Sequence, residues 1–143
     1  MKRCRIGYGL LVLAFFLSGI QCKKVKEDIA RKFIIDAMTN GLWIVQVFTD
    51  DNVDISTDFR DYEFQFKENG EVYAIKTTTA EQVTGTWEGN VNDLTIFSNF
   101  PGVGEPLLRL NDTWKIINNT TKLVEAQPFS TGRSAYLKLV KKG

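Results

Sequence analysis

The sequence predicts an all-β protein with one N-terminal helix, in which about eight antiparallel strands form an up-and-down barrel. After Gly41, hydrophobic residues recur at every second position, which is the period of a strand with one buried face. Segments rich in Val, Ile, Thr and aromatic residues then follow one another with short turns and no second helix between them. Such a meander exposes two strand edges unless it closes, so closure into a small barrel is favoured.

The helix is predicted over residues 27–40. Its apolar residues form two adjoining rows at four-residue spacing, and together they make one broad face. The rows are Ile29, Phe33 and Ala37, and Ala30, Ile34 and Met38. Such a face suits either a membrane surface or the domain that follows. We favour packing on the domain, because the polar face mixes Lys and Asp instead of being basic.

The strands are predicted from alternation and from the turns between them. Residues 69–70 are Asn-Gly, the pair that best forms a two-residue hairpin turn, because both positions need positive φ. Residues 108–116 alternate along one face and form either one long strand or two strands joined at 111–112. The other predicted strands cover residues 42–48, 59–67, 71–78, 82–88, 93–98, 122–127 and 135–141.

An eight-stranded barrel has an interior just wide enough for its own side chains or for one small ligand. The predicted interior positions are Trp43, Val45, Phe64, Phe66, Ile75, Trp87, Ile96, Trp114, Ile116, Leu137 and Leu139. A register error of one residue would turn any of these strands inside out. Phe97, Phe100 and Phe129 lie near predicted loops, where they would rim an open mouth.

Several short motifs follow one another along the meander. They are Gly41-Leu42-Trp43, Glu68-Asn69-Gly70-Glu71, Gly85-Thr86-Trp87 and Asp112-Thr113-Trp114. With these motifs and the preceding helix, residues 29–140 resemble the bacterial lipocalin-like domains, many of which are short lipoproteins. The resemblance implies a lipocalin-like fold, in which Trp43 of the G-x-W element plugs the closed end. It also implies a basic residue over the indole ring, for which Arg133 and Lys138 are the candidates.

The N-terminus has the parts of a lipoprotein signal: a positive region at residues 2–5, an apolar run at 6–17, and Cys22. The run is shorter than the roughly 18–20 residues that cross a bilayer as a permanent helix. Cleavage before Cys22 and lipidation of its thiol are therefore predicted. The chain then divides into a lipoprotein signal at 1–21, a lipidated tether at 22–28 and the barrel with its helix at 29–143.

The predicted lipid on Cys22 places the protein in the cell envelope, with the membrane as a partner. The residues directly after it, Lys23 and Lys24, are not an acidic retention signal. Delivery to the outer membrane is therefore favoured, and the periplasmic and surface faces remain open alternatives.

The composition argues against catalysis. The chain has no histidine, the commonest general base and metal ligand. The signal holds three of the 18 basic residues and none of the 17 acidic ones, so the mature chain has a net charge of about −2 and no excess of positive charge for nucleic acid. Asp50, Asp51 and Asp54 lie close enough to suggest a calcium site, but their spacing is not that of a calcium loop, so a solvated acidic loop is favoured.

These features predict a non-enzymatic, membrane-anchored lipoprotein that binds a small hydrophobic ligand inside the barrel. The predicted binding residues are Trp43, Phe64, Phe66, Trp87 and Trp114. The alternative is a structural or protein-interaction module of the envelope with a solid barrel. A monomer without a metal, cofactor or nucleic-acid partner is expected.

Overall fold

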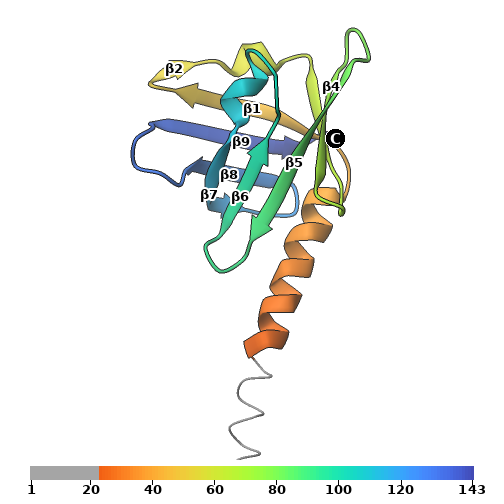
Figure 1. Cartoon of the computed structure of the whole chain (residues 1–143), viewed down its shortest axis with the longest axis vertical. Coiled ribbons are helices and arrows are strands. Elements are labelled where there is room, and N and C mark those ends of the chain that lie inside the picture. The colour runs from red at the N-terminus through yellow and green to blue at the C-terminus, as the bar shows by residue number, and fades with distance from the viewer. Residues whose placement is uncertain (1–22) are drawn as a thin grey trace, which may run out of the picture.

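The structure, a computed structural model, describes residues 23–143, and the predicted signal and Cys22 lie outside the described residues. Eight strands form a closed antiparallel barrel in which each strand pairs with the next one along the chain, and β9 pairs back to β1 (Figure 1). A two-residue strand, β2, pairs in the antiparallel direction with the last two residues of β1. The prediction of an all-β, up-and-down barrel with one N-terminal helix is confirmed.

The helix covers residues 23–39, so residues 23–28, predicted as a tether, are helical. The strands are β1 (Trp43–Asp50), β2 (Val53–Asp54), β3 (Tyr62–Phe66), β4 (Glu71–Lys76), β5 (Gln82–Asn90), β6 (Thr95–Asn99), β7 (Asp112–Asn119), β8 (Leu123–Pro128) and β9 (Ala135–Lys141). Two 3₁₀ helices, η1 (Ser56–Phe59) and η2 (Leu107–Leu110), interrupt the longer loops.

The two ends of the barrel differ, because antiparallel strands send alternate connections to opposite ends. At the helix end, the helix meets the turns after β3, β5 and β7. At the loop end lie the connections 51–61, 77–81, 100–111 and 129–134, which include η1 and η2. These two names are used below.

Only the C-terminal part of the helix packs on the barrel. Met38 is buried, and Ile34 and Ile35 pack against the core. Ile29 and Phe33, however, are 65% and 54% exposed. The prediction that one broad apolar face packs on the domain is correct for the last turns and wrong for the first turns, which project beyond the barrel (Figure 1).

Residues 108–110 do not continue a strand. They belong to η2, and β7 begins only at Asp112. Leu107 and Leu110 are buried while Leu108 is 48% exposed, which is the three-residue period of a 3₁₀ helix. Phe59 likewise lies in η1, where it is buried, and does not begin a strand.

Most of the predicted interior positions are buried. In β4, however, the face that points into the barrel is the one that was predicted to point outward. Ala74 pairs with Phe64 and Val72 pairs with Phe66, so these four side chains share the inner face. Ile75 therefore points outward, and its predicted interior position is wrong by one residue. Ile116 is only partly buried.

A bulge changes the face of β1 halfway along the strand. The pairing of β1 with β9 shifts between Val45 and Val47, and the extra residue changes the phase of alternation. Phe48 is therefore fully buried three residues after Val45, and Asp50 at the end of the strand is buried as well.

Candidate functional site

The barrel interior holds a small cavity of about 40 Å³. Within the described chain, its wall consists of twelve apolar side chains and the hydroxyl of Ser98. The apolar residues are Met38, Phe64, Phe66, Val72, Ile96, Phe100, Leu110, Trp114, Val124, Ala126, Leu137 and Leu139. The lining of this cavity is thus almost wholly apolar.

The structure brings only some of the predicted binding residues to this cavity. Phe64, Phe66 and Trp114 lie on its wall, whereas Trp43 and Trp87 do not. Trp87 donates its indole N–H to the Lys67 carbonyl at 2.8 Å and lies edge-on to Phe66, with ring centroids 5.3 Å apart. Trp87 therefore braces the turn after β3. That these residues bind a ligand stays a prediction.

Trp43 closes the helix end of the barrel. Its side chain is fully buried, and its indole N–H donates to the Met38 carbonyl at 2.9 Å. Gly41 makes the turn between the helix and β1 with a φ of +88°, which a residue without a Cβ adopts readily. The plugging role that the G-x-W element implies for Trp43 thus fits its position.

The basic residue over Trp43 is neither of the two predicted candidates. The Lys141 Nζ lies 5.4 Å from the centre of the Trp43 ring, and Lys141 is the direct strand partner of Trp43. Arg133 instead lies over Trp114, with its guanidinium carbon 5.2 Å from that ring. The cation meets the indole across the β1–β9 ladder, so Lys138, three residues earlier on β9, does not occupy this position.

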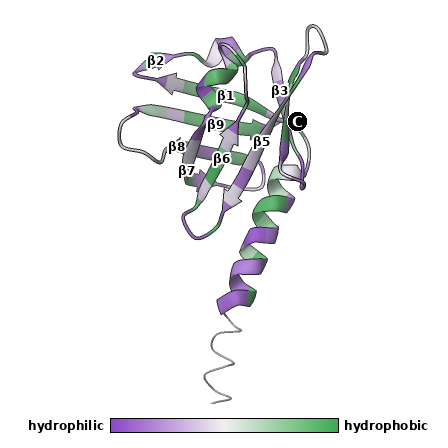
Figure 2. Cartoon of the chain, in the orientation of Figure 1, coloured by the Kyte–Doolittle hydropathy of each residue, from purple (hydrophilic) through white to green (hydrophobic). Residues whose placement is uncertain are grey.

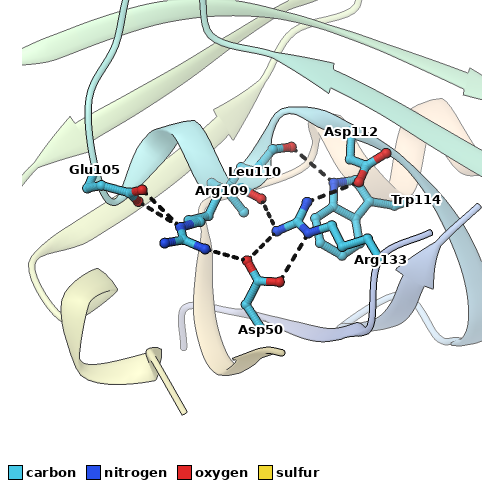
Figure 3. A network of polar contacts seen from close by, with 7 residues as sticks. All are labelled: Asp50, Glu105, Arg109, Leu110, Asp112, Trp114 and Arg133. Carbon is cyan, nitrogen blue, oxygen red and sulfur yellow. Dashed lines mark hydrogen bonds and ion pairs between the residues drawn. The ribbon is translucent and has the colours of Figure 1, made fainter. Parts of the chain in front are cut away.

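A network of charged side chains closes the loop end (Figure 3), and we call it the ionic latch: Asp50, Glu105, Arg109, Asp112 and Arg133. Arg133 donates to both carboxylate oxygens of Asp50, at 3.1 and 2.7 Å, and to Asp112 at 3.0 Å. Arg109 donates to Asp50 at 3.1 Å and to Glu105 at 2.9 Å. Two arginines from different loops therefore converge on one buried carboxylate.

The ionic latch lies directly against the cavity wall. Arg133 donates to the Arg109 carbonyl at 2.8 Å, which ties the 129–134 loop to η2. The next carbonyl, that of Leu110, accepts from the Trp114 indole at 3.0 Å and from the Ser98 hydroxyl. The η2 helix is therefore tied on one side to the latch and on the other to the cavity wall.

Asp50 is not a solvated acidic residue, contrary to the prediction for its loop. Its side chain is 4% exposed, whereas those of Arg133 and Arg109 are 23% and 46% exposed. Hydrogen bonds from Arg133 lower the pKa of Asp50 below its ordinary value, with a further contribution from Arg109, and burial opposes them. Hydrogen bonds to the acidic partners raise the pKa values of both arginines. Asp50 and the two arginines are thus charged at neutral pH.

The site combines an apolar cavity with a carboxylate, that of Asp50, whose hydrogen bonds are already made. Both Asp50 oxygens already accept hydrogen bonds from the two arginines. Among residues 23–143, no group of three His, Cys, Asp or Glu side chains is arranged to hold a metal ion. None of the helices in that part of the chain has both the length and the hydropathy needed to cross a bilayer.

Sequence reasoning missed several parts of the site. Ser98 and Leu110 carried no motif, and Phe100 was predicted to rim an open mouth but is buried against the cavity. Asp50 and Arg133 are 83 residues apart, so local spacing gives no sign of their pairing. The inward position of Asp50 also depends on the bulge after Val45, so alternation along the strand gave no signal for it.

No family model and no curated protein matches this sequence. Among solved structures, the chain is similar to a DUF4847 family protein from Bacteroides vulgatus, with 16% identity and a TM-score of 0.56, over 77% of this chain and 99% of that one. It is also similar to Japanin from Rhipicephalus appendiculatus, solved bound to cholesterol, with 9% identity and a TM-score of 0.50, over 73% of this chain and 76% of that one. At these identities the similarity shows the fold alone. Together with the closed eight-stranded barrel, these matches show that the chain has a lipocalin-like fold.

Proposed function

We propose that this protein is a lipid-anchored, non-enzymatic component of the bacterial cell envelope that binds a small apolar molecule inside its barrel. The apolar wall of the cavity supports an apolar guest, and Ser98, whose hydroxyl donates to the Leu110 carbonyl, is the one polar residue on that wall. Cholesterol bound to Japanin, a protein of similar fold, supports a ligand of this chemical class.

The ionic latch is the single observation on which the proposal depends most. A solid barrel would gain most from an apolar plug at both ends, as Trp43 provides at the helix end. The loop end carries in addition the ionic latch, in which every side chain except that of Asp50 is partly exposed. Arg109, at 46% exposure, exchanges its ion pair with Asp50 for water at a lower cost than the more buried Arg133 does. The loop end is therefore the entry route in this proposal.

The size of the cavity sets what binding requires. Sites for small molecules usually enclose about 300–1,000 Å³, far more than the 40 Å³ present here. A ligand therefore has to displace side chains at the loop end, where Phe100 and Leu110 close the cavity. In this proposal η2 moves outward with Leu110 and Arg109, and the latch opens.

Sterol binding tests the proposal in solution. With residues 23–143 and the fluorescent sterol dehydroergosterol, we expect energy transfer from the three tryptophans, of which Trp114 lies on the cavity wall. Ala126→Leu should weaken binding by at least about tenfold, because the larger side chain takes up the volume of about 40 Å³ that a ligand would enter. Gln127→Leu is the matched control, because Gln127 is exposed on the same strand and should leave binding unchanged.

Two results of that titration would contradict the proposal. One is the absence of binding by the unaltered protein, both to the sterol and to a long-chain fatty acid. The other is equal binding by Ala126→Leu and Gln127→Leu, which would place the probe on the outer surface. Either result favours the second candidate function, a structural or protein-interaction module with a solid barrel, which the small cavity volume supports.

The lipid anchor is tested separately, since Cys22 lies outside the described residues. The apolar run at 6–17 followed by Cys22 supports acylation at this position. We expect labelled palmitate to be incorporated into the full chain in its host, and Cys22→Ser to abolish the label. Cys4→Ser is the control and should retain the label, because Cys4 lies in the predicted signal. Label that persists in Cys22→Ser would refute the anchor.

A further inference from the structure

We propose that the exposed apolar face at the helix end lies on an anionic phospholipid bilayer. This face, the helix patch, consists of Val25, Ile29, Phe33 and Leu94, which are 54%, 65%, 54% and 49% exposed. The inference extends the proposed function, and it uses one part of it, namely that the residues before Lys23 hold the chain at a membrane. The barrel ligand plays no part in it.

The four residues form one continuous surface. Val25, Ile29 and Phe33 recur at four-residue spacing, so they line one side of the helix over about 12 Å. Leu94 reaches the same surface from the turn between β5 and β6. A groove of about 440 Å³ joins the two elements, and its wall includes Ile29, Phe33, Leu94 and Ile116.

The helix patch is not the surface by which the helix packs on the barrel. The helix is already joined to the barrel through Ile34, Ile35 and Met38, on its C-terminal turns. Its first turns project beyond the barrel, with hydrophobic and hydrophilic residues interleaved along them (Figure 2). Single exposed apolar residues are ordinary on a protein surface, whereas a contiguous row beside an apolar groove marks an interaction site.

Residues 27–40 alone are not basic, but the structure begins the helix at Lys23 and so adds three lysines to it. With them, charge indicates a lipid surface as the occupant. Residues 23–39 carry five basic side chains and three acidic ones, and three of the basic ones, Lys23, Lys24 and Lys26, stand in the first four positions. All three are exposed at the end of the helix that projects farthest from the barrel. Basic residues beside an apolar row are the composition of helices that lie in the interface of anionic membranes.

The position of the helix, directly after the predicted lipidation site, also favours a lipid bilayer as the occupant of the patch. Lys23 directly follows Cys22, and Val25 is three residues beyond it. A lipid on Cys22 would therefore hold Val25 at the level of the headgroups. Because the helix end and the loop end are opposite ends of the barrel, the ionic latch would then face away from the bilayer.

Vesicle binding without the anchor tests this inference. All buried apolar side chains in the described chain lie from Met38 to Leu139, so residues 23–143 contain the whole core of the barrel. We expect this chain to sediment with vesicles of phosphatidylcholine and phosphatidylglycerol, and less with pure phosphatidylcholine. Ile29→Gln combined with Phe33→Gln should weaken the binding by at least about tenfold, since both side chains would lose burial in the membrane.

The matched control removes equally exposed apolar residues from the loop end. Val53 and Phe129 are 59% and 55% exposed, and Val53→Gln with Phe129→Gln should bind vesicles as the unaltered chain does. A nitroxide attached to Ile29→Cys gives a second measurement, because residues 23–143 contain no other cysteine. We expect its spectrum to show immobilisation and protection from aqueous relaxation agents once vesicles are added.

Two outcomes would overturn the inference. One is equal vesicle binding by the helix-end and loop-end variants. The other is a concentration-dependent dimer that the helix-end variant abolishes, together with a nitroxide that vesicles leave unchanged; the patch would then bind a second copy of the chain. Neither outcome depends on whether Cys22 is acylated or whether the barrel binds a sterol.

Discussion

Replacement of Trp43 by alanine is expected to lower the free energy of unfolding by about 3–5 kcal/mol, the usual cost of truncating a buried aromatic side chain. Trp43 has no exposed surface and joins three parts of the fold. It pairs with Phe64 on β3 and Lys141 on β9, and it donates to the Met38 carbonyl in the helix. Equilibrium unfolding in urea measures the loss, and a loss below about 1 kcal/mol would contradict the plugging role.

Trp43→Phe separates the hydrogen bond of Trp43 from its volume. Phenylalanine retains an aromatic ring but cannot donate to the Met38 carbonyl, which costs about 1–3 kcal/mol if that oxygen stays buried without a partner. We expect amide hydrogen exchange to become faster in residues 34–39, where the helix joins the barrel. Exchange that is unchanged there would mean that Met38 packing alone fixes the helix.

Asp50→Asn is expected to destabilise the protein by about 2–4 kcal/mol. Removing one partner of a fully buried ion pair costs about 3–5 kcal/mol, and the partial exposure of Arg109 and Arg133 reduces that value. The change leaves both arginines facing a neutral amide. Asp51→Asn is the matched control on the neighbouring, exposed residue and should change stability by less than about 0.5 kcal/mol.

The pH dependence of stability, compared between the unaltered protein and Asp50→Asn, gives a second test of the latch. The pKa of Asp50 is lowered from 3.8 in the folded protein, chiefly by hydrogen bonds from Arg133. Its contribution to stability is therefore complete above the unfolded-state value near pH 4 and is lost as the pH falls through the lower folded value. The stability difference between the unaltered protein and Asp50→Asn should thus shrink below pH 4. A difference that grows on acidification would contradict the assignment of Asp50 to the latch.

The fold could be predicted because its main signals are local. Alternation along β3, the Asn69-Gly70 turn and the absence of a second helix together specify a meander, and closure follows from the exposed edges. Trp43 could be placed at one end because the G-x-W element resembles a known motif. The turn and the G-x-W element each lie within a few residues of sequence, and alternation is read within single strands.

The features that could not be predicted depend on contacts between residues far apart in the sequence. The bulge after Val45 and the inward face of Ala74 are set by which residue of the neighbouring strand each one meets. Asp50 and Arg133 meet only after the barrel has closed. The cavity volume depends on how twelve apolar side chains fill the interior, so no sequence pattern distinguishes a solid barrel from one that opens.

The central claim, that the barrel carries a small apolar molecule, is tested most directly by native mass spectrometry of protein from its own host. The protein would be exported with a conventional cleavable signal and with Cys22 replaced by serine, so that no lipid of its own adds mass. The proposal predicts a species heavier than the bare chain by one small apolar molecule, which organic solvent removes. A spectrum that repeatedly shows the bare chain alone would contradict it.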